Sequence, residues 1–104
     1  MIVEYTKDYF NEAVEFTLYL NKGVDAFRYY PSDKQKIEEH RIKKDQIERV
    51  KTLLFIENNT ICGLIDYNEI KSERYIQITA MFIEGNFDRI SQVFFTYLFT
   101  WGQI

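Results

Sequence analysis

Cysteine, proline and glycine are all scarce in this chain of 104 residues, and long apolar runs are missing. The single cysteine, Cys62, excludes an intrachain disulfide and is typical of a reducing compartment. One proline and four glycines argue against a disordered or low-complexity chain. No apolar stretch reaches the roughly 18 residues that span a bilayer, and the first residues show no signal-peptide pattern. We therefore expect a cytoplasmic protein with no membrane partner.

Positive charge is also in short supply, since 13 Lys and Arg face 16 Asp and Glu, which gives a net charge of −3. Nucleic-acid binding depends on neutralising phosphates, so we expect no nucleic-acid partner. A zinc site needs several Cys or His ligands, and one residue of each kind, Cys62 and His40, predicts no metal site. Aromatic residues are abundant, because nine Phe and eight Tyr exceed the needs of one modest core. Some of them should lie on a surface that contacts another molecule.

The hydrophobic pattern predicts a single α+β domain over residues 1–104, in the order β-α-α-β-β-β-α. A first strand is expected at Ile2–Tyr5, followed by a helix that Thr6 caps and Gly23 closes. The apolar stripe of this helix consists of Phe10, Ala13, Val14, Phe16, Leu18 and Leu20. Ser32 or Asp33 then caps a mostly exposed helix at residues 33–50, whose few apolar residues are Ile37, Ile42, Ile47 and Val50.

An antiparallel meander at residues 51–83 forms the centre of the expected fold, with strands at Lys51–Glu57, Thr60–Asn68 and Tyr75–Ile83. Asn58-Asn59 suits a tight hairpin turn, and Gly63 marks a bulge or a close backbone approach. In the third strand we expect one face to carry Ile76, Ile78, Ala80 and Phe82. A helix at residues 89–101, capped by Asp88, is apolar nearly all round, which predicts burial on more than one side.

Few side chains indicate a chemistry on their own. Cys62 and His40 are a conceivable nucleophile pair, although a mid-strand cysteine is more typical of a small buried hydrophobe. Asp66 interrupts an apolar strand, which indicates either an acid–base residue or an aspartate at the sheet rim. Spacing selects none of the paired carboxylates, which are Glu38/Glu39, Asp66/Glu69 and Glu84/Asp88. The loop of Arg28, Tyr29 and Tyr30 either lines a ligand cleft or packs over the sheet.

One stretch combines an apolar strand, a tight turn and an Ile-x-Gly-apolar return: Leu53-Leu54-Phe55-Ile56-Glu57-Asn58-Asn59-Thr60-Ile61-Cys62-Gly63-Leu64-Ile65. It resembles the second and third strands of the GNAT acyltransferases (Gcn5-related N-acetyltransferases). Tyr75–Ile83 would correspond to that family's fourth strand, and residues 89–101 to the helix that follows. The order of elements is similar over nearly the whole chain. The resemblance implies the N-terminal half of a GNAT-like sheet and a function related to acetyl transfer.

In this family a Gln/Arg-x-x-Gly-x-Gly/Ala loop after the fourth strand holds the pyrophosphate of acetyl-CoA at a helix N-terminus. The resemblance implies that acetyl-CoA binds the corresponding segment, with cofactor-binding residues Ile83, Gly85, Asn86 and Arg89. Residues 84–91 depart from the family pattern, because they contain one glycine and carry Glu84 and Asp88 where an anion would sit. No catalytic residue carries over, so the sequence leaves open whether the chain is an enzyme.

Two functions therefore stand beside each other. The first is a GNAT-like relative that binds an acyl-CoA and acetylates an amine, either as a shortened family member or as a piece of a longer product. The second is a non-catalytic homodimeric interaction or regulatory module. An open sheet edge at residues 75–83 and an apolar helix at 89–101 both need a cover, so we expect a homodimer through these two elements.

Overall fold

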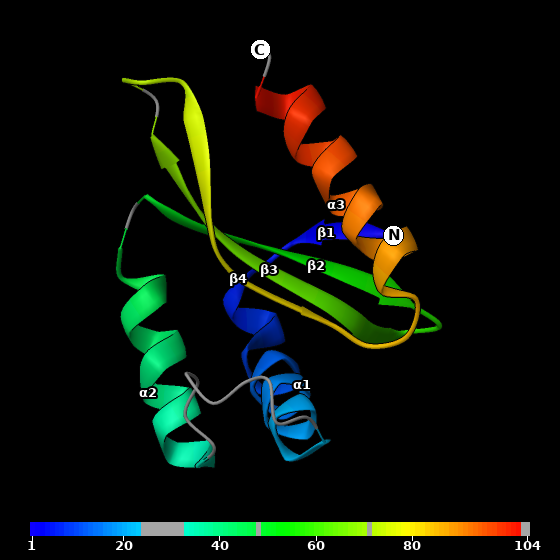
Figure 1. Ribbon diagram of the computed structural model, residues 1–104. Coiled ribbons are helices and arrows are strands. Elements are labelled where there is room, and N and C mark those ends of the chain that lie inside the picture. Colours follow the sequence, from blue (N-terminus) through cyan, green and yellow to red (C-terminus); the bar gives the residue numbers. More distant parts are fainter. Residues whose placement is uncertain (24–32, 48, 71, 103–104) are drawn as a thin grey trace.

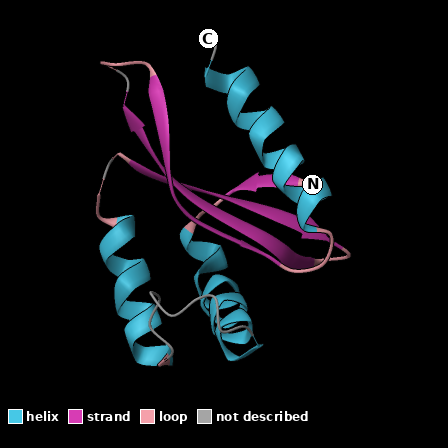
Figure 2. Cartoon of the chain, in the orientation of Figure 1, coloured by secondary structure: helices cyan, strands magenta, loops and turns pink. Residues whose placement is uncertain are grey.

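A four-stranded antiparallel sheet with helices on both faces makes up the computed structural model, which describes residues 1–23, 33–47, 49–70 and 72–102 (Figure 1, Figure 2). Across the sheet the strands follow chain order: β1 (Ile2–Glu4), β2 (Val50–Glu57), β3 (Thr60–Ile70) and β4 (Tyr75–Ile83). The helices are η1 (Lys7–Tyr9), α1 (Phe10–Gly23), α2 (Lys34–Asp45) and α3 (Phe87–Gly102). The predicted α+β class and the order of elements are confirmed.

The sheet separates two apolar cores because its strands carry apolar residues on both faces. On one face Leu54, Leu64 and Phe82 pack against Ala13, Phe16 and Leu20 of the predicted α1 stripe. On the other face Leu53, Phe55 and Ile65 pack against Ile90, Phe94 and Leu98 of α3. Figure 1 shows α1 and α2 on one side of the sheet and α3 on the other. None of the helices within the described ranges is long and apolar enough to cross a membrane.

The β2–β3 hairpin confirms both predictions made for it. Asn58 and Asn59 have φ values of 53° and 60°, as the tight turn requires. The strand register shifts next to Gly63, where Phe55 lies opposite Gly63 but Ile56 lies opposite Ile61. A Cβ on Gly63 would lie 2.9 Å from the Phe94 ring, so this position combines a bulge with close packing of α3.

A second bulge corrects the predicted faces of β4. Asp66 lies opposite Ala80 while the next residue, Tyr67, lies opposite Ile78, so Thr79 is the extra residue. Because one extra residue reverses the alternation, Ile76 packs with the α3-side core, whereas Ala80 packs on the α1 side. The expectation that Ile76 and Ile78 share a face with Ala80 and Phe82 is therefore wrong.

The helices differ from the predictions before α1, at the end of α2 and on one flank of α3. The Thr6 side chain makes no capping hydrogen bond, and η1 lies between it and α1. Asp33 caps α2 as predicted, since its carboxylate accepts from the Gln35 N–H at 2.8 Å, but α2 ends at Asp45 rather than near residue 50. The flank of α3 with Phe95 and Phe99 is open, with exposed fractions of 42% and 71%. The prediction that α3 is buried on more than one side is therefore wrong. The loop of Arg28, Tyr29 and Tyr30 lies outside the described residues.

Candidate functional site

The junction between β4 and α3 carries the four residues expected to bind a cofactor. Gly85 has a φ of +96°, and, apart from its two chain neighbours, no described residue has an atom within 4 Å of the place where a Cβ would be. The Asn86 side-chain oxygen accepts from the Arg89 N–H at 3.1 Å, so Asn86 caps α3 and the predicted cap, Asp88, lies inside the helix. Ile83 packs against the α3-side core. Gly85 and Asn86 therefore border the start of α3, while the Ile83 side chain contributes to the core.

The Arg89 side chain extends from α3 toward β2 rather than over the start of its own helix. Its guanidinium pairs with the Glu57 carboxylate at 2.5 Å and lies 5.6 Å from the centre of the Phe55 ring. Both charged side chains are about half exposed. Arg89, which was expected to bind the cofactor, is thus already paired with a carboxylate of β2.

Two acidic residues flank the junction, as the sequence indicated. Asp88 lies in the first turn of α3, and Glu84 lies between β4 and Gly85. A hydrogen bond to the Glu84 carboxylate, together with its charge, raises the pKa of the Tyr19 hydroxyl on α1. Glu84 is therefore linked to α1, whereas Asp88 is the acidic residue within the helix start itself.

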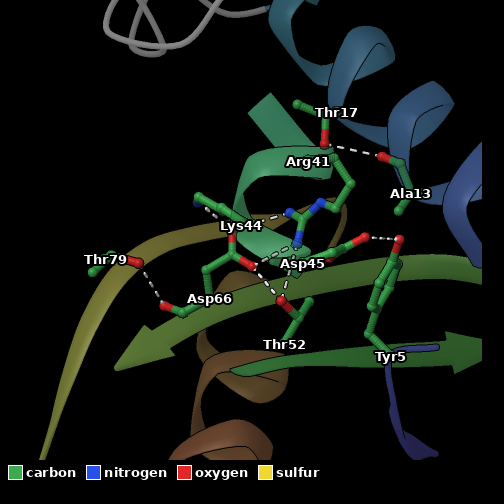
Figure 3. Close-up of polar contacts among 9 residues, drawn as sticks. All are labelled: Tyr5, Ala13, Thr17, Arg41, Lys44, Asp45, Thr52, Asp66 and Thr79. Atoms are coloured by element: carbon green, nitrogen blue, oxygen red, sulfur yellow. Dashed lines mark hydrogen bonds and ion pairs between the residues drawn. The ribbon is translucent and has the colours of Figure 1, made fainter. Parts of the chain in front are cut away.

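A buried ion cluster around Asp66 is the most highly organised polar group in the part of the chain that the structure describes (Figure 3). Both Asp66 oxygens meet the Arg41 guanidinium, at 3.0 and 3.1 Å, and Lys44 Nζ lies 2.6 Å from one of them. The Thr52 hydroxyl donates to the other oxygen at 2.5 Å. The Asp66 side chain is fully buried and that of Arg41 is 4% exposed. Asp66 therefore lies inside the sheet, and the expectation of an aspartate at its rim is wrong.

The electrostatics of this cluster favour an ionised Asp66. Burial raises the pKa of the Asp66 carboxyl, but the charges and hydrogen bonds of Arg41 and Lys44 outweigh it, so this pKa lies below its ordinary value. Burial and the Asp45 carboxylate raise the pKa of Tyr5, whose hydroxyl donates to Asp45 at 3.1 Å. The Arg41 guanidinium lies 5.3 Å from the centre of the Tyr5 ring. The cluster thus fastens α2 to the sheet and leaves Asp66 unsuited to accept a proton from a substrate.

An open cavity of about 480 Å³ lies where β1 leaves the edge of β2. Its charged lining is balanced between three carboxylates and three amines: Glu4, Asp45, Glu69, Lys7, Lys44 and Lys51. The strand pairing places this cavity near Val50 and Asn68, at the opposite end of the sheet from the pairs that join Phe55, Gly63 and Ile83. The cavity and the β4–α3 junction are therefore separate places.

The remaining candidates are kept apart by the fold. Cys62 packs on the α3 side of the sheet, and His40 lies on α2 across the sheet, so they do not form a nucleophile pair. Burial, followed by the charges of Lys44 and Arg41, lowers the pKa of His40. Within the described ranges, no group of three His, Cys, Asp or Glu is arranged to hold a metal ion.

Sequence reasoning missed Arg41 and Lys44, because a polar helix with few apolar residues was interpreted as solvated. The available signal was Asp66 itself. A carboxylate inside an apolar strand needs a buried cation, and residues 33–51 hold seven Lys and Arg against five Asp and Glu in a chain whose net charge is negative. Thr52 carried no such signal, since only the observed register places it directly opposite Asp66.

Comparison with known proteins finds a likeness in fold at low sequence identity. A search of protein-family models gave no match, and neither did a search of curated proteins. The chain is similar to a crystal structure described as a possible acetyltransferase from Clostridium difficile 630, with a TM-score of 0.63 and 17% sequence identity. The match covers 97% of this chain and 66% of that one, which is just under two thirds of its length. The likeness shows the fold, in agreement with the expected GNAT-like half sheet.

Proposed function

We propose that this chain binds an acyl-CoA at the β4–α3 junction, as the sheet-and-helix part of an acetyltransferase-like domain. The observation that carries the proposal is the likeness in fold to a possible acetyltransferase over 97% of the chain. The finer part of the proposal is acyl transfer to an amine, in which the amine attacks the thioester carbonyl and loses a proton while CoA leaves as a thiol. No residue is assigned as the base for that step.

The backbone at the junction supports anion binding. The first N–H groups of a helix have no partner within the helix, and the helix dipole adds partial positive charge at the same place. The Asn86 side chain engages the Arg89 N–H, which leaves the N–H groups of Phe87 and Asp88 as the donors for a phosphate. Because Gly85 has no side chain and open space around it, a phosphate can approach the backbone closely.

The charges at the junction act against tight binding, and they provide the test. Asp88 is a first-turn carboxylate, and Arg89 is paired with Glu57. A carboxylate about 5 Å from a phosphate in water opposes binding by roughly 1 kcal/mol, or about a fivefold change in affinity. We therefore expect weak binding of CoA that becomes tighter when the Asp88 charge is removed.

Calorimetric titration with acetyl-CoA and with CoA tests the proposal. Asp88→Asn should bind both ligands about fivefold more tightly than the wild type. The matched control is Asp8→Asn, which removes a first-turn carboxylate from η1 and should leave the affinity unchanged. No heat at millimolar acetyl-CoA overturns the proposal. Binding with equal affinity to the wild type and to Asp88→Asn would assign the ligand to another surface.

The alternative function, a non-catalytic module that acts through self-association, is favoured by a different observation. Phe95 and Phe99 on α3 are 42% and 71% exposed, which is unusual for two neighbouring phenylalanines on one helix flank. The same titration separates the two functions, since a module that only self-associates gives no binding heat with CoA.

A further inference from the structure

The outer edge of β4 pairs with no strand among the residues that the structure describes. The strand order β1-β2-β3-β4 gives β4 a neighbour on one side only. Its nine residues, Tyr75–Ile83, include no charged residue, proline or glycine. Edge strands of monomeric proteins usually carry such residues, which prevent pairing with another chain. An uncharged edge of this length is instead suited to pairing.

The register shows which peptide groups of β4 face outward. Glu84 donates its N–H to Cys62 of β3. Peptide groups alternate in direction along a strand. The peptide groups of Phe82 and Ala80 therefore also point toward β3, whereas those of Ile83 and Met81 point outward. Beyond the bulge at Thr79 this alternation reverses, so the peptide groups of Ile78 and Ile76 point outward. The outward peptide groups therefore form two pairs, Ile76 with Ile78 and Met81 with Ile83. The two pairs are equally far from the midpoint between Thr79 and Ala80.

An apolar flank of α3 lies beside this edge. Arg89 and Tyr97 mark the α3 flank that faces β2, since Arg89 pairs with Glu57 of that strand. Phe95 and Phe99 each lie two residues from Tyr97, which is about 200° around the helix axis. Because Phe94 and Leu98 point down to the sheet, Phe95 and Phe99 occupy the flank toward β4. Figure 1 shows α3 on the same side of the sheet along its whole length.

Ile78 continues this surface on the sheet. It lies directly opposite Tyr67, whose ring belongs to the α3-side core, and it is 40% exposed. Ile78, Phe95 and Phe99 thus form a surface of exposed apolar side chains along the free edge, which we name the edge surface. An exposed apolar surface next to an unpaired strand typically marks a site of protein association.

We propose that the edge surface binds a second copy of this chain, with the two β4 strands paired antiparallel about a twofold axis between Thr79 and Ala80. This axis places Ile76 opposite Ile83 of the second copy and Ile78 opposite Met81 of the second copy. Each of these residues directs its peptide group outward, so the pairs can exchange hydrogen bonds. The two α3 helices then lie on the same face of one continuous sheet, with their Phe95 and Phe99 flanks toward each other.

Charge favours a copy of this chain over a charged partner. No like charges meet along the paired strands, because β4 has none. At each end of the two paired β4 strands, Arg74 of one copy comes near Glu84 of the other, which is a pairing of opposite charges. Such an arrangement is isologous, and an isologous arrangement closes at two copies.

The size of the edge surface predicts a moderate affinity. Phe95 and Phe99, at 42% and 71% exposure, leave about 200 Å² of side chain exposed in each copy. The strand edge adds backbone and Ile78 to this area. Stable complexes bury about 800 Å² per partner, so this contact is at the lower end of the range. We therefore expect a dimer that dissociates on dilution and is independent of acyl-CoA binding.

Sedimentation velocity of the full chain, from micromolar to millimolar concentration, tests the association. Ile78→Lys places two buried ammonium groups near the twofold axis and should weaken dimerisation by at least about 30-fold. The matched control is Ile42→Lys on α2, a residue of the same type and similar exposure (47%), which should leave dimerisation unchanged. A wild type that stays monomeric at millimolar concentration overturns the proposal, as does an equal loss in both variants.

Cysteine cross-linking tests the register in a Cys62→Ser chain. With the proposed axis, Thr79→Cys places one cysteine on each β4 strand, with an offset of one residue between them along the paired strands. This separation is within reach of a disulfide. Gln77→Cys, also exposed on β4, places its two cysteines five residues apart along the strands, about 16 Å, which a disulfide cannot bridge. We expect oxidised dimer from Thr79→Cys only. Cross-linking of both, or of Gln77→Cys alone, would contradict the proposed pairing.

Discussion

Asp66→Asn removes the charge at the centre of the buried ion cluster with little change of shape. It leaves the Arg41 guanidinium, 4% exposed, without its carboxylate, while Lys44 at 15% exposure retains a path to water. Removing one partner of a buried ion pair costs about 3–5 kcal/mol, because the other charge remains buried. A domain of this size has a total unfolding free energy of about 5–15 kcal/mol. The expected loss is therefore a large share of the whole stability.

Urea unfolding followed by circular dichroism at neutral pH measures this loss. The matched control is Glu57→Gln, which breaks the exposed pair with Arg89 and should cost less than about 1 kcal/mol. A double variant, Asp66→Leu with Arg41→Met, should recover most of the stability, since apolar residues of similar size often replace a buried ion pair without loss. If Asp66→Asn costs no more than Glu57→Gln, then the cluster does not fasten α2 to the sheet.

The same cluster predicts the acid limb of the stability curve. The pKa of Asp66 is lower in the folded chain than its ordinary value of 3.8, so its contribution is fully present above that value. The contribution is lost as the pH falls from 3.8 through the lower pKa of the folded chain. The Asp66→Leu, Arg41→Met double variant should therefore lose less stability than the wild type on acidification. Parallel acid limbs for the two proteins would show that other carboxylates govern this range.

Three further predictions concern the core, the α3 cap and alkaline pH. Gly63→Ala places a Cβ 2.9 Å from Phe94 and should cost about 1–3 kcal/mol in urea unfolding, a loss that Phe94→Leu in the same chain should reverse in part. Asn86→Ala should cost about 1 kcal/mol, whereas Asn86→Asp should retain the cap; equal losses would contradict the observed hydrogen bond. Burial raises the pKa of Tyr67 to about 12, so its share of stability should be present below the ordinary value of 10.0 and be lost as the pH rises above it. Phenolate absorbance of the wild type against Tyr67→Phe measures this ionisation, and an identical titration of both would refute it.

The strands and the main helices of this fold could be predicted from local pattern. Leu53-Leu54-Phe55-Ile56 is apolar on both faces and does form a central strand, and Asn58-Asn59 adopts the expected positive φ. The faces of β4 could not be predicted beyond Thr79, because a bulge without glycine leaves no local signature and reverses the alternation. Register is a tertiary property, so the position of Thr52 opposite Asp66 was equally inaccessible.

The candidate site was predicted in part. The sequence placed Gly85 and Asn86 in the segment between the third meander strand and the last helix, and it identified the acidic residues around them, but it placed the helix cap at Asp88 rather than at Asn86. It did not show that Arg89 turns away to Glu57, since that contact joins residues that are far apart in the chain. Helix amphipathicity also failed for α2, because the residue that it buries beside Ile37 is the charged Arg41.

The way in which α2 is attached has a consequence for the order of folding. The carboxylate that holds Arg41 lies on β3, and the hydroxyl that completes the cluster lies on β2. The complete cluster requires both strands to be paired, because β3 supplies the carboxylate that compensates the Arg41 charge and β2 supplies the hydroxyl that completes the hydrogen bonds of that carboxylate. We expect α2 to dock after the rate-limiting step of folding. Conservative variants of Arg41 should then speed unfolding and leave the folding rate unchanged, whereas Leu64→Ala in the sheet should slow folding.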